Sequence, residues 1–133
     1  MTPTPGVPPV LESAQPTAGD DKETIGAAYK WLKLLDAGNA GAAWDISSAH
    51  LKSVVSRKKW VEGIVEMRKP FGKPDARKAE KFARSHQLPG APEGDYSIIE
   101  FQTEFGNGKQ ATEQVIWMLE KDDVWRVSGY FIR

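Results

Sequence analysis

The sequence predicts an α+β fold in which three N-terminal helices pack on a curved, four-stranded antiparallel sheet. Apolar residues recur every three to four positions up to about residue 69, the spacing of amphipathic helices. From Lys73 onward the period changes to two, which is typical of strands. The last stretch, residues 125–133, alternates large residues on both faces, so we expect the rest of the domain to cover it.

The first 19 residues predict a disordered, proline-rich linker. They contain five of the nine prolines and no apolar periodicity. A spacer rich in proline and threonine is what remains when an export signal is removed, whereas a native cytoplasmic start is the alternative. We expect one domain over residues 20–133, because a chain of 133 residues has room for one core.

The first helix is predicted to begin at Asp20, which forms a capping-box-like pair with Glu23. Gly38 and Asn39 supply its stop. Its apolar positions follow at helical spacing: Ile25, Ala28, Tyr29, Trp31, Leu32 and Leu35.

Two further helices are predicted before the sheet. A short one spans about residues 40–48 and turns Ala43 and Trp44 inward. The third follows a cap at Ser56 and ends near Lys69, before Pro70. Its wide apolar stripe contains Trp60, Val61, Ile64, Val65 and Met67.

Four strands follow, in the order of an antiparallel meander. They span residues 76–88, 96–105, 110–120 and 124–133. Asn107–Gly108 is a strong hairpin signal between the second and third strands. Lys121, Asp122 and Asp123 join the last two.

Composition excludes several functional classes. The absence of cysteine excludes disulfides and thiolate metal sites, and no apolar run approaches the length of about 20 residues that spans a bilayer. The net charge is zero, but residues 52–84 hold 11 Lys and Arg against 4 Asp and Glu. This stretch favours a solvated basic face over a dedicated anion-binding surface, and no nucleic-acid partner is expected.

The outer face of the predicted sheet is a candidate interface. Apolar and charged residues alternate onto it in a mixture that is typical of contact surfaces. We expect a homodimer through this face, with an exposed monomer surface as the alternative. The interface candidates are Ile98, Glu100, Ile116, Met118, Arg126, Tyr130 and Ile132. Glu100 and Arg126 are expected to pair there as structural residues.

Several blocks of the sequence resemble a bacterial family catalogued as domain of unknown function 4019. The blocks are Trp31-Leu32, Asp36-Ala37-Gly38, Trp44, Val55-Ser56-Arg57, Trp60, Arg68-Lys69-Pro70-Phe71-Gly72, residues 88–96 and residues 125–133. The resemblance covers about residues 24–133. It implies an exported, periplasmic protein of a Gram-negative bacterium, and it assigns no catalytic or binding residue. The element order also looks like the cystatin-like and nuclear transport factor 2-like cone folds, a likeness of fold alone.

A cone of this kind often encloses an apolar pocket. The ligand-pocket candidates are Trp44, Trp60, His86, Phe101, Trp117 and Tyr130. The alternative is that these rings fill a small core. His50 and His86 lie far apart in the sequence, so no metal site, cofactor or catalytic residue is predicted, and an enzyme is not favoured. The sequence therefore predicts a binding module of the bacterial envelope that acts through its sheet face and basic helix surface. The alternative is a pocket protein for a small hydrophobic ligand, or a minor enzyme.

Overall fold

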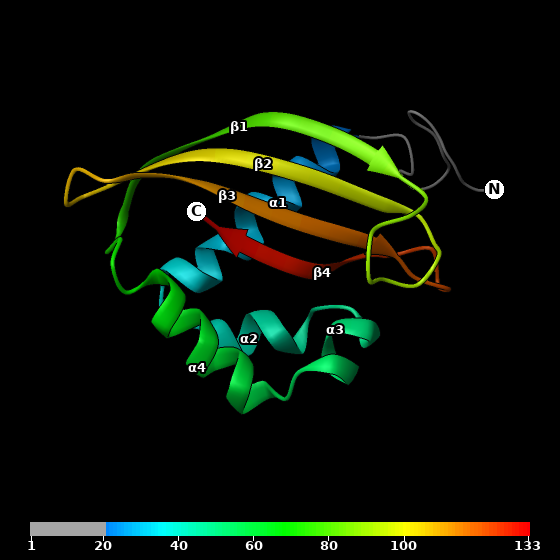
Figure 1. The fold of residues 1–133 in the computed structure, drawn as a ribbon. Helices are drawn as coiled ribbons and strands as arrows, with labels where there is room; N and C mark the ends of the chain where they lie inside the picture. The colour runs from blue at the N-terminus through cyan, green and yellow to red at the C-terminus, as the bar shows by residue number, and fades with distance from the viewer. Residues whose placement is uncertain (1–20) are drawn as a thin grey trace.

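The structure is a computed structural model that describes residues 21–133 as four helices and one sheet (Figure 1). The helices are α1 (Asp21–Asp36), α2 (Ala40–Asp45), α3 (Ala49–Val54) and α4 (Arg57–Arg68). The strands are β1 (Pro74–Ser85), β2 (Tyr96–Phe105), β3 (Gln110–Leu119) and β4 (Trp125–Ile132). The predicted α+β class and antiparallel sheet are confirmed. The predicted cap at Asp20 and the predicted linker lie outside the described residues.

Helix α1 forms because its apolar residues line one side at helical spacing. Ala28, Trp31 and Leu32 are almost fully buried. Burying a side chain the size of leucine stabilises a fold by roughly 1.5–3 kcal/mol. The helix stops where Gly38 adopts a φ of +80° and the Asn39 N–H donates to the Leu34 carbonyl at 2.8 Å.

The prediction of three helices was wrong, because residues 49–54, for which no helix was predicted, form the additional helix α3. Helix α2 ends at Asp45. The Ser48 N–H then donates to the Val127 carbonyl of β4 at 2.8 Å, while the Ser48 Oγ accepts from the Leu51 N–H at 3.1 Å and caps α3. A hydrogen bond to the sheet therefore holds the residue that separates α2 from α3.

Helix α4 begins and ends where the sequence indicates. The Ser56 Oγ accepts from the Lys59 N–H at 3.2 Å, and the helix ends at Arg68. Its buried face is narrower than predicted, because it holds Trp60, Ile64 and Arg68. Val65 and Met67, which were placed in the apolar stripe, are exposed.

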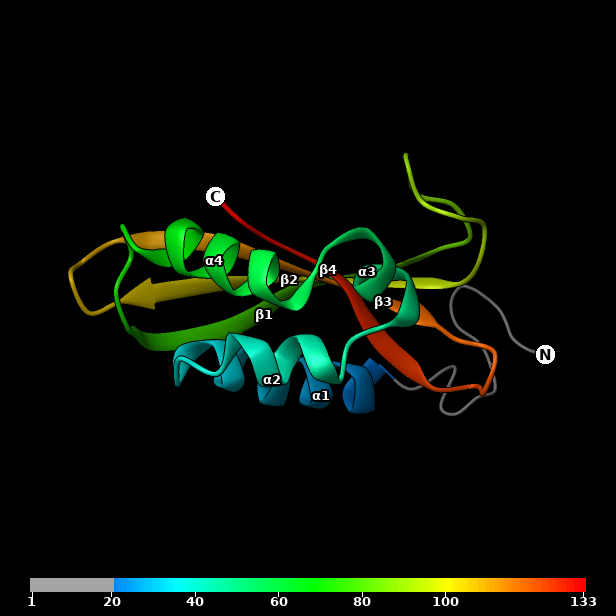
Figure 2. The same ribbon diagram turned by 90° about the horizontal axis from the view of Figure 1, so that it is seen from below.

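The sheet is a four-stranded meander in the order β1-β2-β3-β4, with every neighbouring pair antiparallel. The helices lie on one side of the curved sheet (Figures 1 and 2). We call that side the inner sheet face and the other the outer sheet face. Gly108 adopts a φ of +83° in the β2–β3 turn, as the predicted hairpin requires. Inner-face residues from β2, β3 and β4 form the core with α1 and α4: Ile99, Phe101, Val115, Trp117, Val127 and Tyr130.

A bulge in β4 reverses the predicted sides of its C-terminal half. Trp117 pairs with Val127, but Ile116 pairs with Gly129, so one extra residue, Ser128, is inserted. Tyr130 therefore lies on the inner face and is 4% exposed, whereas Phe131 lies outside and is 51% exposed. The assignment of Tyr130 and Ile132 to the outer face was wrong, because simple alternation cannot anticipate an inserted residue.

Candidate functional site

A groove runs between α1 and the hairpin that joins β3 to β4. Its α1 side is built from residues that recur at helical spacing, with Ala27, Lys30, Trp31 and Leu34 as the main ones. Two adjoining depressions, of about 220 Å³ and 440 Å³, make up the groove. We call it the tryptophan groove, because Trp31, Trp117 and Trp125 form its walls.

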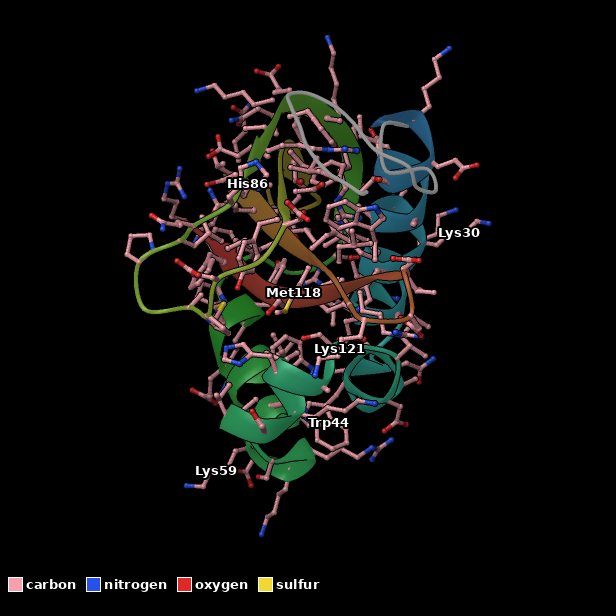
Figure 3. The ribbon with its side chains drawn as sticks, turned by 90° about the vertical axis from the view of Figure 1, so that its right-hand side faces the viewer. Lys30, Trp44, Lys59, His86, Met118 and Lys121 are labelled. Atoms are coloured by element: carbon pink, nitrogen blue, oxygen red, sulfur yellow. The ribbon has the colours of Figure 1, made fainter. Side chains whose placement is uncertain are left out.

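The rim of the tryptophan groove carries apolar side chains that face solvent. Ile46, which follows α2, is 57% exposed, and Val124 of the β3–β4 hairpin is 43% exposed. Single exposed apolar residues are ordinary, but these two border one depression. Lys30 stands at the same rim and points outward from α1 (Figure 3). The rim is therefore mixed and the walls are apolar, as in many ligand sites.

The five tryptophans divide into two groups by their hydrogen bonds. Trp31 Nε1 donates to the Ala43 carbonyl at 3.3 Å, Trp44 Nε1 to the Val55 carbonyl at 3.0 Å, and Trp60 Nε1 to the Ala40 carbonyl at 2.9 Å. The buried Nε1 atoms of Trp117 and Trp125 have no acceptor among the described residues. A buried donor without a partner costs about 1–3 kcal/mol. Both of these indoles line the tryptophan groove.

Charged side chains close the hairpin end of the groove. Arg126 bonds to Glu120 at 2.6 Å and to Asp122 at 2.9 Å. These hydrogen bonds raise the pKa of Arg126 and lower that of Asp122. The predicted pair between Glu100 and Arg126 does not form, because Arg126 turns to its own hairpin and Glu100 accepts from Gln114 at 3.1 Å. The hairpin is thus held in place beside Val124 and Trp125.

A second cluster, the charged network, lies between the ends of α1 and α4 and the inner sheet face. It consists of Asp36, Arg68, Arg77, Thr103, Glu113 and Tyr130. Arg77 Nη1 and Nη2 donate to both oxygens of Asp36, at 2.8 and 3.0 Å, and Arg77 Nε donates to Glu113 at 2.8 Å. Such two-pronged bonding is a strong form of ion pair.

Glu113 is the most deeply buried charge of this network. Its side chain is 0% exposed, and it accepts from Thr103 Oγ1 at 2.6 Å and from the Tyr130 hydroxyl at 2.5 Å. Arg68 Nη2 donates to Asp36 at 2.6 Å, while Arg68 Nη1 has no partner among the described residues. The network thus satisfies almost all of its polar atoms internally, and we assign it a structural role.

The pKa shifts in the charged network follow from burial and pairing. Burial alone raises the pKa of Asp36, but hydrogen bonds from Arg77 and Arg68 outweigh it, so the pKa lies below its ordinary value. Burial raises the pKa of Tyr130, and the adjacent Glu113 carboxylate raises it further. Asp36 is therefore charged and Tyr130 neutral at pH 7.

The six predicted pocket residues are not gathered around one depression. Trp60 and Phe101 are buried in the core, and Phe101 packs edge-on against Tyr29 at 5.0 Å between ring centroids. Tyr130 stacks beside Trp31 at 5.8 Å and belongs to the charged network. Trp117 is the candidate that lines the tryptophan groove. Figure 3 shows Trp44 and His86 far apart in the molecule.

Histidines and carboxylates do not form a site in the described part of the chain. The His86 side chain is 68% exposed and its Nδ1 lies 2.7 Å from Asp95. Among residues 21–133, no group of three histidine, aspartate or glutamate side chains is placed to hold a metal ion. Within the same residues, no helix is long and apolar enough to cross a membrane.

The remaining interface candidates lie on the outer sheet face. Ile98 and Ile116 pair directly between β2 and β3, and both are partly exposed. Met118 lies near the 86–95 loop, because a Cβ added at Gly94 would stand 3.8 Å from the Met118 Cε. The exposed ring of Phe131 also lies on this face. The face is thus a small apolar area between polar strands.

The basic stretch of the sequence is partly used inside the molecule. Arg68 and Arg77 belong to the charged network, Arg57 bonds to Asp45 at 2.9 Å, and Arg84 lies over the Trp125 ring at 5.2 Å. Lys58 and Lys59 of α4 remain exposed. Part of the predicted basic face is therefore structural.

Sequence reasoning missed both the tryptophan groove and the charged network. One signal for the network was present: Glu113 stands at an inward position of β3, between Ala111 and Val115. A carboxylate on a buried strand face needs a buried cation. No comparable signal marked the groove, because its walls come from segments about 90 residues apart.

Comparison with known proteins gives one match. The family model described as "Protein of unknown function (DUF4019)" matches residues 27–130, from α1 to β4. No curated protein and no solved structure matches the chain. The family that the sequence blocks resembled is therefore confirmed.

Proposed function

This chain belongs to the DUF4019 family of proteins of unknown function, and we propose that it is a binding module that holds an extended apolar segment of a polypeptide in the tryptophan groove. One observation carries the proposal. Trp31, Trp117 and Trp125 line one groove, and Ile46 and Val124, which are 57% and 43% exposed, stand at its rim. An apolar segment of a polypeptide would cover these side chains.

The shape of the groove favours a chain over a compact ligand. The α1 residues along it extend from Glu23 to Leu34. Eleven helical steps correspond to about 16 Å. That length accommodates roughly five residues of an extended chain, at about 3.3 Å per residue. The apolar walls supply affinity for apolar side chains of the bound segment.

The proposal is tested with the full chain and a capped hexapeptide, Gly-Val-Ala-Ala-Val-Leu. Its binding is followed through the indole N–H signals in nuclear magnetic resonance spectra, assigned by single Trp→Phe variants. We expect shifts for Trp117 and Trp125 and none for Trp44 and Trp60. No shift at millimolar peptide would contradict the proposal.

A matched pair of variants locates the binding. Ile46→Glu with Val124→Glu places charges on the groove rim, at residues that are 57% and 43% exposed. Val65→Glu with Met67→Glu places them on α4, at residues that are 57% and 38% exposed. The first pair is expected to abolish the shifts and the second to preserve them. Equal binding of the hexapeptide by the two double variants would show that it does not bind in the tryptophan groove.

A homodimer through the outer sheet face is a second proposal. It is supported by the Ile98–Ile116 pair and by the Phe131 ring, which is 51% exposed on the same face. Sedimentation at micromolar concentration tests it, with Phe131→Glu as the disrupting variant. A monomeric mass for the unmodified chain excludes the dimer.

We also propose a cellular location and a fold likeness for this protein. We place the protein in the bacterial envelope, on the strength of its family resemblance, and cell fractionation with a periplasmic marker tests this. The four helices on one face of a curved antiparallel sheet are compatible with the cystatin-like and nuclear transport factor 2-like cone folds. That likeness describes architecture and carries no activity.

A further inference from the structure

The two depressions of the tryptophan groove carry opposite charges. Among residues 21–133, the charged side chains that line the smaller depression are the carboxylates of Glu23 and Asp123. Those that line the larger depression are the cations Lys30 and Arg126. Lys121, which belongs to the same hairpin as Asp123, lines neither depression. The groove is therefore apolar along its walls and acidic at one end only.

The charges of Lys30 and Asp123 are available to a ligand. Arg126 is neutralised within the hairpin, because it bonds to Glu120 at 2.6 Å and to Asp122 at 2.9 Å. Lys30 and Asp123 are exposed, and neither side chain forms an ion pair with the described part of the chain. A ligand in the groove would meet one cation and one carboxylate that have no other partner there.

Lys30 and Asp123 stand on opposite edges of the groove and at different positions along it. Lys30 belongs to α1, whereas Asp123 belongs to the hairpin that joins β3 to β4. Asp123 shares its depression with Glu23, which precedes Lys30 by two helical turns, or about 10 Å. The two charges are therefore offset both across the groove and along it.

An extended polypeptide matches this offset when a basic and an acidic residue lie three positions apart. Three residues of extended chain span about 10 Å, at about 3.3 Å per residue. Side chains that are an odd number of positions apart point to opposite edges. The basic side chain then faces Asp123, the acidic side chain faces Lys30, and the apolar residues between them contact the tryptophan walls.

We propose that the tryptophan groove selects extended segments in which a basic and an acidic residue flank two apolar residues, an inference that rests on the proposed function of the groove. A segment with two like charges gains one attraction and one repulsion at the rim, and an uncharged segment gains neither. Exposed ion pairs add little affinity, so the apolar walls supply binding and the rim decides between ligands.

Three capped hexapeptides that differ only in charge test this selection with the full chain: Val-Lys-Ala-Val-Glu-Leu, Val-Lys-Ala-Val-Lys-Leu and Val-Gln-Ala-Val-Gln-Leu. Their dissociation constants are measured from the indole N–H shifts of Trp117 and Trp125. The mixed-charge peptide is expected to bind about threefold to fivefold more tightly than either of the others at about 0.01 M salt. This preference should fall below about twofold at about 1 M salt, because the screening length shortens from about 30 Å to about 3 Å.

Reversing one rim charge should change which peptide binds most tightly. Lys30→Glu leaves carboxylates on both edges of the groove, so the peptide with two lysines is expected to become the tightest ligand. Lys59→Glu, the matched control, makes the same change of charge at an exposed position of α4, and Figure 3 shows Lys59 far from Lys30. The control is expected to keep the preference for the mixed-charge peptide.

Asp123→Asn removes the charge on the hairpin edge and keeps the turn. Asp123 adopts a φ of +64°, and asparagine enters this left-handed region more readily than most residues. The variant is expected to bind the mixed-charge peptide about threefold less tightly than the unmodified chain and the uncharged peptide equally well. Asp75→Asn, at an exposed position of β1, is the matched control and should change neither affinity.

The remaining outcomes separate this inference from the proposed function. If none of the peptides shifts the groove indoles, both fail. If the uncharged peptide binds as tightly as the mixed-charge one, the groove binds apolar segments and only the selection by charge is overturned. The selection is also overturned if the mixed-charge peptide remains the tightest ligand of Lys30→Glu. Indole shifts that grow with protein concentration alone would make a second copy of the chain the occupant and overturn both.

Discussion

The charged network and the tryptophan groove both lie between α1 and the sheet, yet they treat polar atoms in opposite ways. In the network, Arg77 of β1 donates both to Asp36 of α1 and to Glu113 of β3. In the groove, Trp117 and Trp125 have buried donors without acceptors among the described residues. The two regions meet where the Trp31 ring packs 5.8 Å from that of Tyr130.

This contrast separates buried polar groups that stabilise the fold from buried polar groups that do not. Buried polar groups are normally paired, so a paired cluster is explained by the fold alone. Buried donors without an acceptor cost free energy and contribute no hydrogen bond. Substitutions should therefore lower stability greatly in the network and only slightly in the groove.

The largest loss of stability is expected for Glu113→Ala. The substitution removes a fully buried carboxylate and leaves Arg77, Thr103 and Tyr130 without their acceptor. Breaking a buried ion pair in this way costs about 3–5 kcal/mol, measurable by urea denaturation. The control Glu104→Ala, on the exposed side of β2, should change the free energy of unfolding by less than about 0.5 kcal/mol. Similar losses in the free energy of unfolding for Glu113→Ala and Glu104→Ala would contradict the structural role of the charged network.

A smaller loss is expected for Tyr130→Phe. The variant keeps the ring in the core but deletes the hydroxyl that donates to Glu113 at 2.5 Å. A hydrogen bond to a charged group contributes about 1.5–3 kcal/mol. The same denaturation experiment on Phe131→Leu, at a residue that is 51% exposed, should give less than about 1 kcal/mol. A larger effect at Phe131 than at Tyr130 would contradict the bulge at Ser128.

Acid is expected to lower the free energy of unfolding by protonating Asp36. The loss should be smaller than for Glu113→Ala or Tyr130→Phe, because the Asp36 side chain is partly exposed. Its pKa in the folded chain lies below the ordinary value of 3.8. The contribution of its charge is therefore complete above the unfolded pKa and is lost as the pH falls through the folded pKa. The stability difference between the unmodified chain and Asp36→Asn should be constant from pH 7 to about 5 and shrink below about 4. A stability difference that grows as the pH falls would contradict the expectation that the pKa of Asp36 is lowered by folding.

The smallest effect is expected for Trp125→Phe in the groove. This change removes a buried N–H that has no acceptor among the described residues, which offsets part of the packing that is lost. We expect the free energy of unfolding to fall by less than about 1 kcal/mol. Trp60→Phe, which deletes a bond of 2.9 Å to the Ala40 carbonyl, should cost more by about 1–2 kcal/mol. If Trp125→Phe is the more damaging of the two, its indole has a structural partner and the contrast between the two regions fails.

The regular elements followed from local signals in the sequence. Strand β2 spans the predicted residues 96–105, and the Asn107–Gly108 turn joins it to β3. Helix α4 begins after Ser56 for the reason predicted. In these cases the signal and the structure depend on the same few neighbouring residues, so the pattern was sufficient.

The sites did not follow from local signals. Helix α3, which was not predicted, follows the bond from Ser48 to Val127, and turning Tyr130 inward required the bulge at Ser128. Arg68 and Arg77 were counted with a solvated basic stretch, although Asp36 and Glu113 hold them in the interior. Each of these features depends on residues that are distant in the chain.

The sequence by itself determined the class of fold, the order of the strands and the family of the protein, because periodicity, turn residues and capping residues act over a few positions. Only the tertiary structure decided which buried polar atoms are satisfied. Pairing of a hydrogen-bond donor depends on where distant segments pack, and periodicity contains no information on that. The difference between a paired Glu113 and an unpaired Trp125 indole is therefore a property of the folded chain alone.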